Sequence, residues 1–203
     1  ATWISRVREV VGWSMSRNLV TVINSHHDNW LDNPFVFNHN LPRFLQIWTQ
    51  ISETFSNHSS NLVFEIFNEP HVMTVDQLNK MNAEVLPIIR KTNPTRIVLF
   101  GGLGRMNPSW IAANPDGMTL PQDPYVAVEV HSYDPFSYAG PFATETSWGT
   151  EADVSAVYDW VNTTRSWAAA RNVSIVYGEF GCTHKQSPKT GRLMWYKTHV
   201  QAA

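Results

Sequence analysis

Short runs of apolar and β-branched residues alternate along this chain with segments in which apolar residues recur every three or four positions. Such continuous runs are typical of strands buried on both faces, as in parallel sheets, and the segments between them are typical of amphipathic helices. The alternation predicts an α/β fold with five strands. The predicted strands are Leu19–Ile23, Leu62–Phe67, Arg96–Phe100, Tyr125–His131 and Ser174–Gly178.

The helical segments carry start and stop signals. Asn18 can take the left-handed cap position after the first helix, and Thr74 with Gln77 resembles a capping box at the start of the third. Pro42 is expected at the start of the second helix, and Pro87 is expected to kink the third. The predicted helices cover residues 4–15, 42–55, 74–92, a long segment after 150, and about 192–200.

An open doubly wound sheet and a (β/α)8 TIM barrel share this alternation. No glycine-rich phosphate turn follows any predicted strand, whereas polar residues cluster directly after the strands, which favours the barrel. A closed barrel has eight strands in about 250 residues, but the 203 residues here supply five. We therefore predict one domain over residues 1–203, an incomplete TIM barrel that corresponds to its third to seventh strands.

Polar side chains follow four of the predicted strands at their carboxyl ends. In a parallel barrel these ends meet on one face, so Glu69 and Glu179 can lie side by side although they are far apart in the sequence. Two facing carboxyl groups indicate glycoside hydrolysis with retention, in which a protonated group assists the leaving group and an ionised one attacks the anomeric carbon from about 5 to 5.5 Å. The clusters are NSHHDNW at 24–30, NEPH at 68–71, HSYDP at 131–135 and GEFG at 178–181.

Taken together, HHD, NEPH, H-x-Y and GEFG in this order resemble family 5 of the glycoside hydrolases, also called cellulase family A of clan A, and in particular its cellulase branch. The similarity extends over residues 3–196 and includes SWGTEAD at 147–153. The resemblance implies an endo-β-1,4-glucanase in which Glu69 is the acid/base and Glu179 the nucleophile. It further implies that Asn68 holds the sugar 2-hydroxyl and that Tyr133 hydrogen-bonds the nucleophile.

The resemblance also implies that His26, His27 and His131 line the subsite of the reacting sugar. Trp30 and Trp148 are expected to be sugar-stacking platforms, because they lie in loops after strands. Other side chains are expected to be structural rather than catalytic: the core residues Trp13, Trp48 and Trp160, and the barrel-lining carboxylates Glu65 and Glu129.

The family's first two strands, one of which carries an active-site arginine, and its eighth strand, which carries an active-site tryptophan, have no counterpart in these residues. The resemblance therefore implies a chain truncated at both ends. Losing both groups lowers the rate. A second hypothesis is accordingly an inactive remnant that binds carbohydrate without hydrolysing it.

The substrate and the type of catalysis are both left open by the motifs. Xyloglucan, lichenan and mannan are candidate substrates beside cellulose, because specificity rests on loops far from the two carboxylates. The adjacent His26 and His27, together with His131, also allow a metal-dependent hydrolase. The leading hypothesis requires neither a metal nor a cofactor.

Charge and composition exclude several other classes of protein. The formal net charge is −2 and no run of like charges occurs, which argues against nucleic acid or an anionic membrane as partners and favours a neutral substrate. No stretch approaches the roughly 20 apolar residues of a membrane span, and the single cysteine, Cys182, excludes an intrachain disulfide. We expect an extracellular protein, monomeric when complete, with no signal peptide in this chain and candidate N-glycans at Asn57, Asn162 and Asn172.

Overall fold

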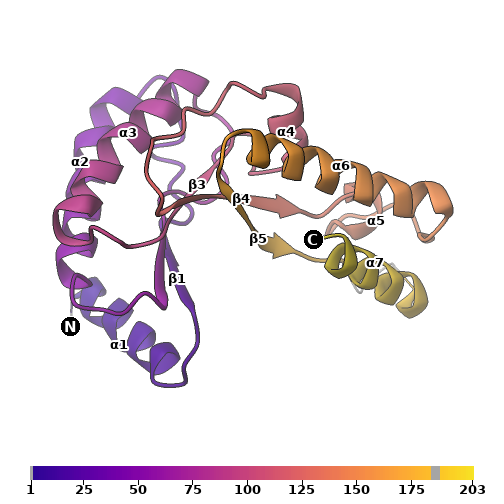
Figure 1. The fold of residues 1–203 in the computed structure, drawn as a ribbon, viewed down its shortest axis with the longest axis horizontal. Coiled ribbons are helices and arrows are strands. Elements are labelled where there is room, and N and C mark those ends of the chain that lie inside the picture. The colour runs from indigo at the N-terminus through magenta and orange to yellow at the C-terminus, as the bar shows by residue number, and fades with distance from the viewer. Residues whose placement is uncertain (1, 184–187) are drawn as a thin grey trace.

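The computed structural model describes residues 2–183 and 188–203 (Figure 1). Within them, five strands alternate with helices in chain order. The strands are β1 (Thr21–Asn24), β2 (Leu62–Glu65), β3 (Val98–Gly101), β4 (Val126–Ser132) and β5 (Ser174–Phe180). The helices are α1 (Trp3–Met15), α2 (Phe37–Thr54), α3 (Val75–Thr92), α4 (Pro108–Ala113), α5 (Phe136–Ala139), α6 (Glu151–Ala170) and α7 (Lys189–Ala202).

The five strands form one parallel sheet in the order β1-β2-β3-β4-β5, so each strand pairs with its neighbours in the chain. The sheet curves into a half-barrel, with α2 and α3 packed together along one part of it and α6 further along (Figure 1). This confirms the predicted fold class, an incomplete (β/α)8 barrel. All strand carboxyl ends consequently lie on one side.

The largest cluster of buried residues lies between the sheet and the helices α2 and α3. Trp48 of α2 is fully buried against Phe64 of β2, and its indole N–H donates to the carbonyl of Ile66 at 3.2 Å. Trp48 is therefore a core residue, as predicted. Trp13 was expected to be one as well, but the structure contradicts this, because the side chain is 49% exposed on α1.

Several element boundaries differ from the prediction. Leu19 and Val20 lie outside β1 and are exposed, because the strand begins only where it pairs with β2 at Thr21. Helix α2 begins well before Pro42, which lies inside it, and α3 is one helix through Pro87. Helices α4 and α5 were not predicted, because they are too short to show a periodic pattern.

None of the helices in the described part of the chain is both long and apolar enough to cross a bilayer.

Candidate active site

The first carboxylate stands directly after β2. Glu69 has a backbone φ of 51°, in the left-handed region that a residue with a Cβ atom rarely adopts. Its neighbour Asn68 donates its backbone N–H to the carbonyl of Ser25, which follows β1, at 2.9 Å. The loop after β2 is thus fastened to the loop after β1, and the unusual backbone turns the Glu69 side chain toward β4.

The second carboxylate depends on an irregularity in β5. Val130 of β4 pairs with Tyr177, but the next residue, His131, pairs with Glu179, so Gly178 is an extra residue in β5. Successive side chains of a regular strand point to opposite faces. The bulge therefore brings Glu179 to the same face of the sheet as His131, and bulges that re-aim a side chain beside an active site are a recognised device.

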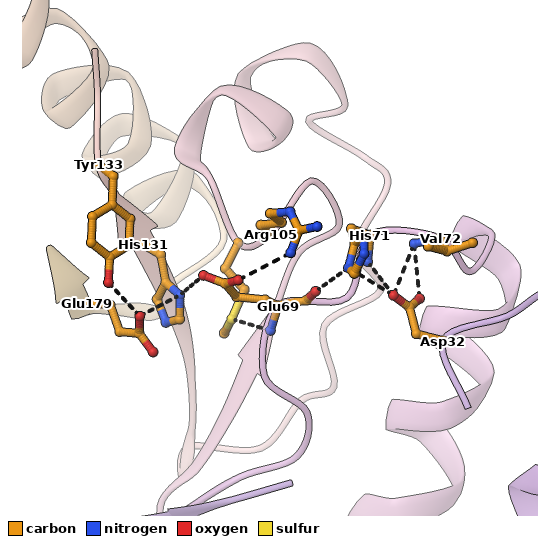
Figure 2. Close-up of polar contacts among 9 residues, drawn as sticks. Asp32, Glu69, His71, Val72, Arg105, His131, Tyr133 and Glu179 are labelled. Atoms are coloured by element: carbon orange, nitrogen blue, oxygen red, sulfur yellow. Dashed lines mark hydrogen bonds and ion pairs between the residues drawn. The ribbon is translucent and has the colours of Figure 1, made fainter. Parts of the chain in front are cut away.

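Four side chains from the carboxyl ends of β2, β4 and β5 meet at this face (Figure 2). His131 Nδ1 lies 3.1 Å from Oε1 of Glu69 and 3.8 Å from Oε2 of Glu179. One carboxylate oxygen of Glu69 and one of Glu179 lie within 4.8 Å of each other. The hydroxyl of Tyr133 donates to Oε2 of Glu179 at 2.8 Å. Two carboxylates thus face each other, with a histidine contacting both.

The ionisable side chains of the candidate active site differ in their protonation at neutral pH. Burial lowers the pKa of His131, but hydrogen bonds to Glu129 and Glu69 and the charge of Glu179 raise it more, to about 9. The hydrogen bond from His131 is the main cause that holds the pKa of Glu69 below its usual range. Burial, followed by the hydrogen bond to Glu179, raises the pKa of Tyr133. At neutral pH, His131 is therefore a cation beside an ionised Glu69, and Tyr133 keeps its proton.

Two further carboxylates lie deeper in the half-barrel, as predicted for Glu65 and Glu129. Both are almost fully buried, and Glu129 Oε1 lies 3.5 Å from His131 Nε2. Burial and the charge of Glu129 raise the pKa of Glu65 to about 8, although Asn24 donates a hydrogen bond to Glu65 at 3.0 Å. Glu65 consequently carries a proton at neutral pH, which reduces the negative charge inside the half-barrel.

Donor atoms close enough to share a metal ion occur in two groups among the described residues. One is Glu69, His131 and Glu179, which is the candidate active site, and the other is Glu65, Glu129 and His131. Neither contains His26 or His27, so the structure does not assemble the three-histidine set of the metal hypothesis.

The loop after β3 contributes residues that sequence reasoning missed. Gly104, Arg105 and Met106 all have left-handed backbones, with φ values of 67°, 61° and 59°. Arg105 Nη1 lies 3.6 Å from Oε2 of Glu69, and the backbone N–H of Glu69 points at the sulfur of Met106 at 3.3 Å. The loop therefore supports Glu69 from the side opposite to β1. Only the three successive left-handed residues mark it, and they are not visible in the sequence.

A cleft of about 550 Å³ extends from Glu69 over the loops after β3 and β4. Glu69, His131 and Tyr133 form one end, and Arg105 and the 57% exposed ring of Phe136 line the remainder. A separate, mainly apolar cavity of about 460 Å³ lies between β5 and α6. None of the site carboxylates lines that second cavity.

The remaining predicted sugar-binding residues are His26, His27, Asn68 and Trp30. His26 and His27 are exposed and contact each other edge to face, and His26 approaches the amide of Asn24 at 3.2 Å. Asn68 is half-buried, and its side-chain carbonyl has no hydrogen-bond partner among the described residues. Trp30 is half-buried, with the guanidinium of Arg43 4.7 Å from its ring.

The prediction that Trp148 offers a flat face to a sugar is wrong for this structure. Its side chain is only 8% exposed, and its ring stacks on Tyr138 and approaches His199. Helices α5 and α7 supply the cover that the sequence did not reveal. The exposed aromatic ring that does line the cleft is Phe136.

A family model described as Cellulase (glycosyl hydrolase family 5) matches residues 1–202. The chain belongs to glycosyl hydrolase family 5. This confirms the family that the motifs NEPH and GEFG predicted.

Individual proteins that are similar to this chain are consistent with this family. Endoglucanase H of Acetivibrio thermocellus is 42% identical over 202 residues, which are 99% of this chain and 21% of the relative. A hyperthermophilic endo-β-1,4-glucanase solved in complex with substrate superposes with a TM-score of 0.90 at 30% identity, over 99% of this chain and 66% of that one. Cel5A of Thermotoga maritima, solved in complex with a mannotriose substrate, gives a TM-score of 0.89 at 25% identity, over 98% and 66%. The chain thus spans only part of each relative's length.

Proposed function

We propose that this family 5 chain carries the catalytic centre of an endo-β-1,4-glucanase that retains the configuration of the anomeric carbon, with Glu69 as acid/base and Glu179 as nucleophile. The observation that carries the proposal is the approach of the two carboxylates to within 4.8 Å, with His131 contacting both. Retaining glycosidases hold their carboxyl groups about 5 to 5.5 Å apart, whereas inverting enzymes need about 6.5 to 9.5 Å to admit a water molecule.

In the first step, an oxygen of Glu179 attacks the anomeric carbon and the bond to the leaving sugar breaks. The leaving oxygen takes a proton from Glu69. Because Glu69 is ionised in the free site, the proton comes from His131, which stays charged to a pH of about 9 and contacts Glu69 at 3.1 Å. Tyr133 holds the attacking oxygen of Glu179 in place.

In the second step, Glu69 accepts a proton from water, whose oxygen attacks the anomeric carbon and releases Glu179, and this proton then returns to His131. Asn68 directly precedes Glu69, and we propose that its side-chain amide contacts the sugar 2-hydroxyl. The same contact strengthens as the oxocarbenium-like transition state develops.

The cleft beside Glu69 suits the leaving-group side of the substrate. It includes Glu69 but not Glu179, and Phe136 offers an exposed ring of the kind that packs against a sugar face. His26, His27 and Trp30, from the loop after β1, are proposed to contact the sugar that Glu179 attacks. A neutral polysaccharide fits a chain with a net charge of only −2.

Within the same chemistry, a second candidate substrate is mannan. The mannotriose complex of Cel5A motivates it, since that relative shares the fold over 98% of this chain. Xyloglucan and lichenan are also candidate substrates. Hydrolysis rates of the full-length protein on cellulose, lichenan, xyloglucan and mannan rank the four polymers.

We further propose that the protein acts outside the cell as a monomer, because insoluble β-glucans do not enter cells. Of the three sequons, Asn57 and Asn172 lie in exposed turns that precede β2 and β5, on the side away from the carboxylates, and Asn162 is exposed on α6. Glycans at these positions leave the cleft open.

The test uses Glu69→Ala and Glu179→Ala in the full-length protein, with the exposed Glu145→Ala as matched control. Each of the first two is expected to lower kcat by about 10² to 10⁴-fold, and Glu145→Ala to leave it unchanged. Added azide restores turnover of a 2,4-dinitrophenyl cellobioside, because azide attacks without the help of a base and can take the place of a missing nucleophile. It yields a β-glycosyl azide with Glu69→Ala, because Glu179 still forms the intermediate, and an α-glycosyl azide with Glu179→Ala.

Three different results would count against this function. Binding of cello-oligosaccharides without turnover in the unmodified protein favours a carbohydrate-binding remnant. Loss of activity after treatment with a chelator, with recovery on adding a divalent cation, favours the metal-dependent hydrolase. Wild-type rates in either glutamate variant rule out the proposed roles.

A further inference from the structure

Asp32 is a buried carboxylate that lies in the loop after β1 and is only 4% exposed. It is not among the residues that the motifs indicate. We propose that Asp32 is a positioning residue for the reaction, which fixes the backbone that carries Glu69. This inference rests on the proposed function of Glu69 as acid/base.

The carboxylate of Asp32 accepts hydrogen bonds from the backbone amides of three successive residues, of which Figure 2 labels His71 and Val72. Oδ2 accepts from the backbone N–H of His71 at 3.1 Å, and Oδ1 accepts from Val72 at 3.0 Å and from Met73 at 2.7 Å. Consecutive amides that converge on one anion form a nest, and hydrogen bonds to an ionised acceptor are stronger than neutral ones. Residues 71–73 are therefore held as a unit by a side chain about 40 positions earlier in the chain.

A second connection leads from Asp32 to Glu69 itself. Nδ1 of His71 lies 3.0 Å from Oδ2 of Asp32 and 2.9 Å from the backbone carbonyl oxygen of Glu69. The carbonyl oxygen only accepts, so Nδ1 carries a hydrogen and donates it to Glu69, while Oδ2 of Asp32 lies beside the same nitrogen. The imidazole of His71 thus ties the buried carboxylate to the peptide group of the catalytic residue.

This connection matters because Glu69 holds a left-handed backbone, with φ at 51°. A residue with a side chain keeps that conformation only when its surroundings impose it. On one side the N–H of Asn68 is bonded to Ser25, and on the other Asp32 fixes residues 71–73, directly before the N-cap Thr74 of α3. Release of Asp32 frees one of these two anchors and allows the carboxylate of Glu69 to turn away from His131.

The test is Asp32→Asn in the full-length protein, which preserves shape and one acceptor oxygen but removes the charge. Two aryl cellobiosides are compared by kcat/KM, which reports the first step. A phenyl leaving group needs a proton from Glu69, whereas a 2,4-dinitrophenyl group departs without one. We expect kcat/KM to fall by about 10 to 100-fold on the phenyl substrate, with little change on the dinitrophenyl substrate.

The matched control is Asp123→Asn. Asp123 also accepts a backbone N–H and has a basic partner, Arg90, but it lies just before β4, at the opposite end of the sheet from Glu69. This control is expected to leave the ratio of the two kcat/KM values unchanged. An equal loss on both substrates in Asp32→Asn, or no loss on either, overturns the positioning role.

Amide hydrogen exchange of the unmodified protein gives a readout that does not depend on activity or on the folding of a variant. Val72 is 50% exposed, yet its N–H is bonded to Asp32, so slow exchange is expected at residues 71–73. Fast exchange there, as in a free loop, overturns the proposal that Asp32 fixes residues 71–73. If Glu69→Ala retains wild-type activity while these amides stay protected, the proposed function fails. The fixation of residues 71–73 by Asp32 is then still supported.

Discussion

His131 and Glu179 are register partners across β4 and β5 only because β5 has one more residue than β4 at that point. The extra residue is Gly178. A Cβ atom placed there would lie 1.6 Å from Oε1 of the buried Glu129, so no larger residue fits without moving that side chain. The direction in which the Glu179 side chain points thus depends on Gly178.

Gly178→Ala is expected to displace Glu129 and shift β5 against β4, because the added methyl group overlaps a buried carboxylate. We expect kcat to fall by about 100-fold or more, together with a lower Tm. Gly12→Ala on α1 is the control, since its Cβ meets no atom within 4 Å. Full activity in Gly178→Ala contradicts this account of the bulge.

His131→Gln tests the proton on the histidine. Because His131 keeps its proton up to a pH of about 9, the alkaline limb of kcat/KM is expected near that value. Without the cation beside it, the pKa of Glu69 rises, and Glu69 must hold the proton itself. The alkaline limb therefore moves to lower pH, and the maximal rate falls by about 10 to 100-fold.

The pH profile of the exposed variant His39→Gln serves as the reference for this experiment. An alkaline limb that stays in place in His131→Gln means that another group supplies the proton.

Tyr133→Phe removes the hydroxyl that donates to Glu179 at 2.8 Å and leaves the ring in place. We expect formation of the glycosyl-enzyme to slow by about 10 to 100-fold, while KM changes little. Single-turnover kinetics measure this step directly. Tyr125→Phe, at the far end of β4, is expected to behave as the unmodified protein, and an equal loss in both variants argues against a specific role for Tyr133.

Glu65→Gln addresses stability. The folded pKa of Glu65 is about 8, above its ordinary value of 4.5, so the folded state binds this proton more tightly than the unfolded chain does. Stability from this group is present in full below pH 4.5 and is lost as pH rises to about 8. Glutamine stays neutral throughout and can still accept the hydrogen bond from Asn24.

The Tm of Glu65→Gln is therefore expected to exceed that of the unmodified protein at pH 8 by at least about 2 to 4 °C, the shift that 1 kcal/mol produces in a domain of this size. Near pH 4 the two proteins are expected to melt together. Thermal unfolding of both proteins and of the exposed variant Glu53→Gln across this range measures the effect. A difference in Tm that does not vary with pH argues against a buried, protonated Glu65.

The order of strands and helices was predictable because burial on both faces of a parallel sheet leaves a continuous apolar signature. That signature does not fix where pairing starts, so Leu19 and Val20 were assigned to a strand although they are exposed beside it. Helices α4 and α5 are too short for periodicity to reveal them, although Asn107 caps α4 and Pro108 is its first residue.

For the site, position after a strand was the informative signal. It indicated Glu69 and His131, and in the structure they are in contact. It did not indicate Asp32 or Arg105, whose contacts with the loop after β2 connect residues tens of positions apart and follow no local pattern. Trp148 was misjudged for a related reason, since only the folded chain reveals that Tyr138 and His199 cover its ring.

Because each strand pairs only with its neighbours in the chain, the loops that form the cleft follow one another in space as they do in the gene. A recombination event that exchanges one strand, loop and helix therefore replaces a contiguous part of the cleft wall. Exchange of the segment between β4 and α6, for example, replaces Phe136 and its surroundings and keeps Glu69 and Glu179. The architecture therefore allows the preferred polymer to change by exchange of a single segment, while both Glu69 and Glu179 are retained.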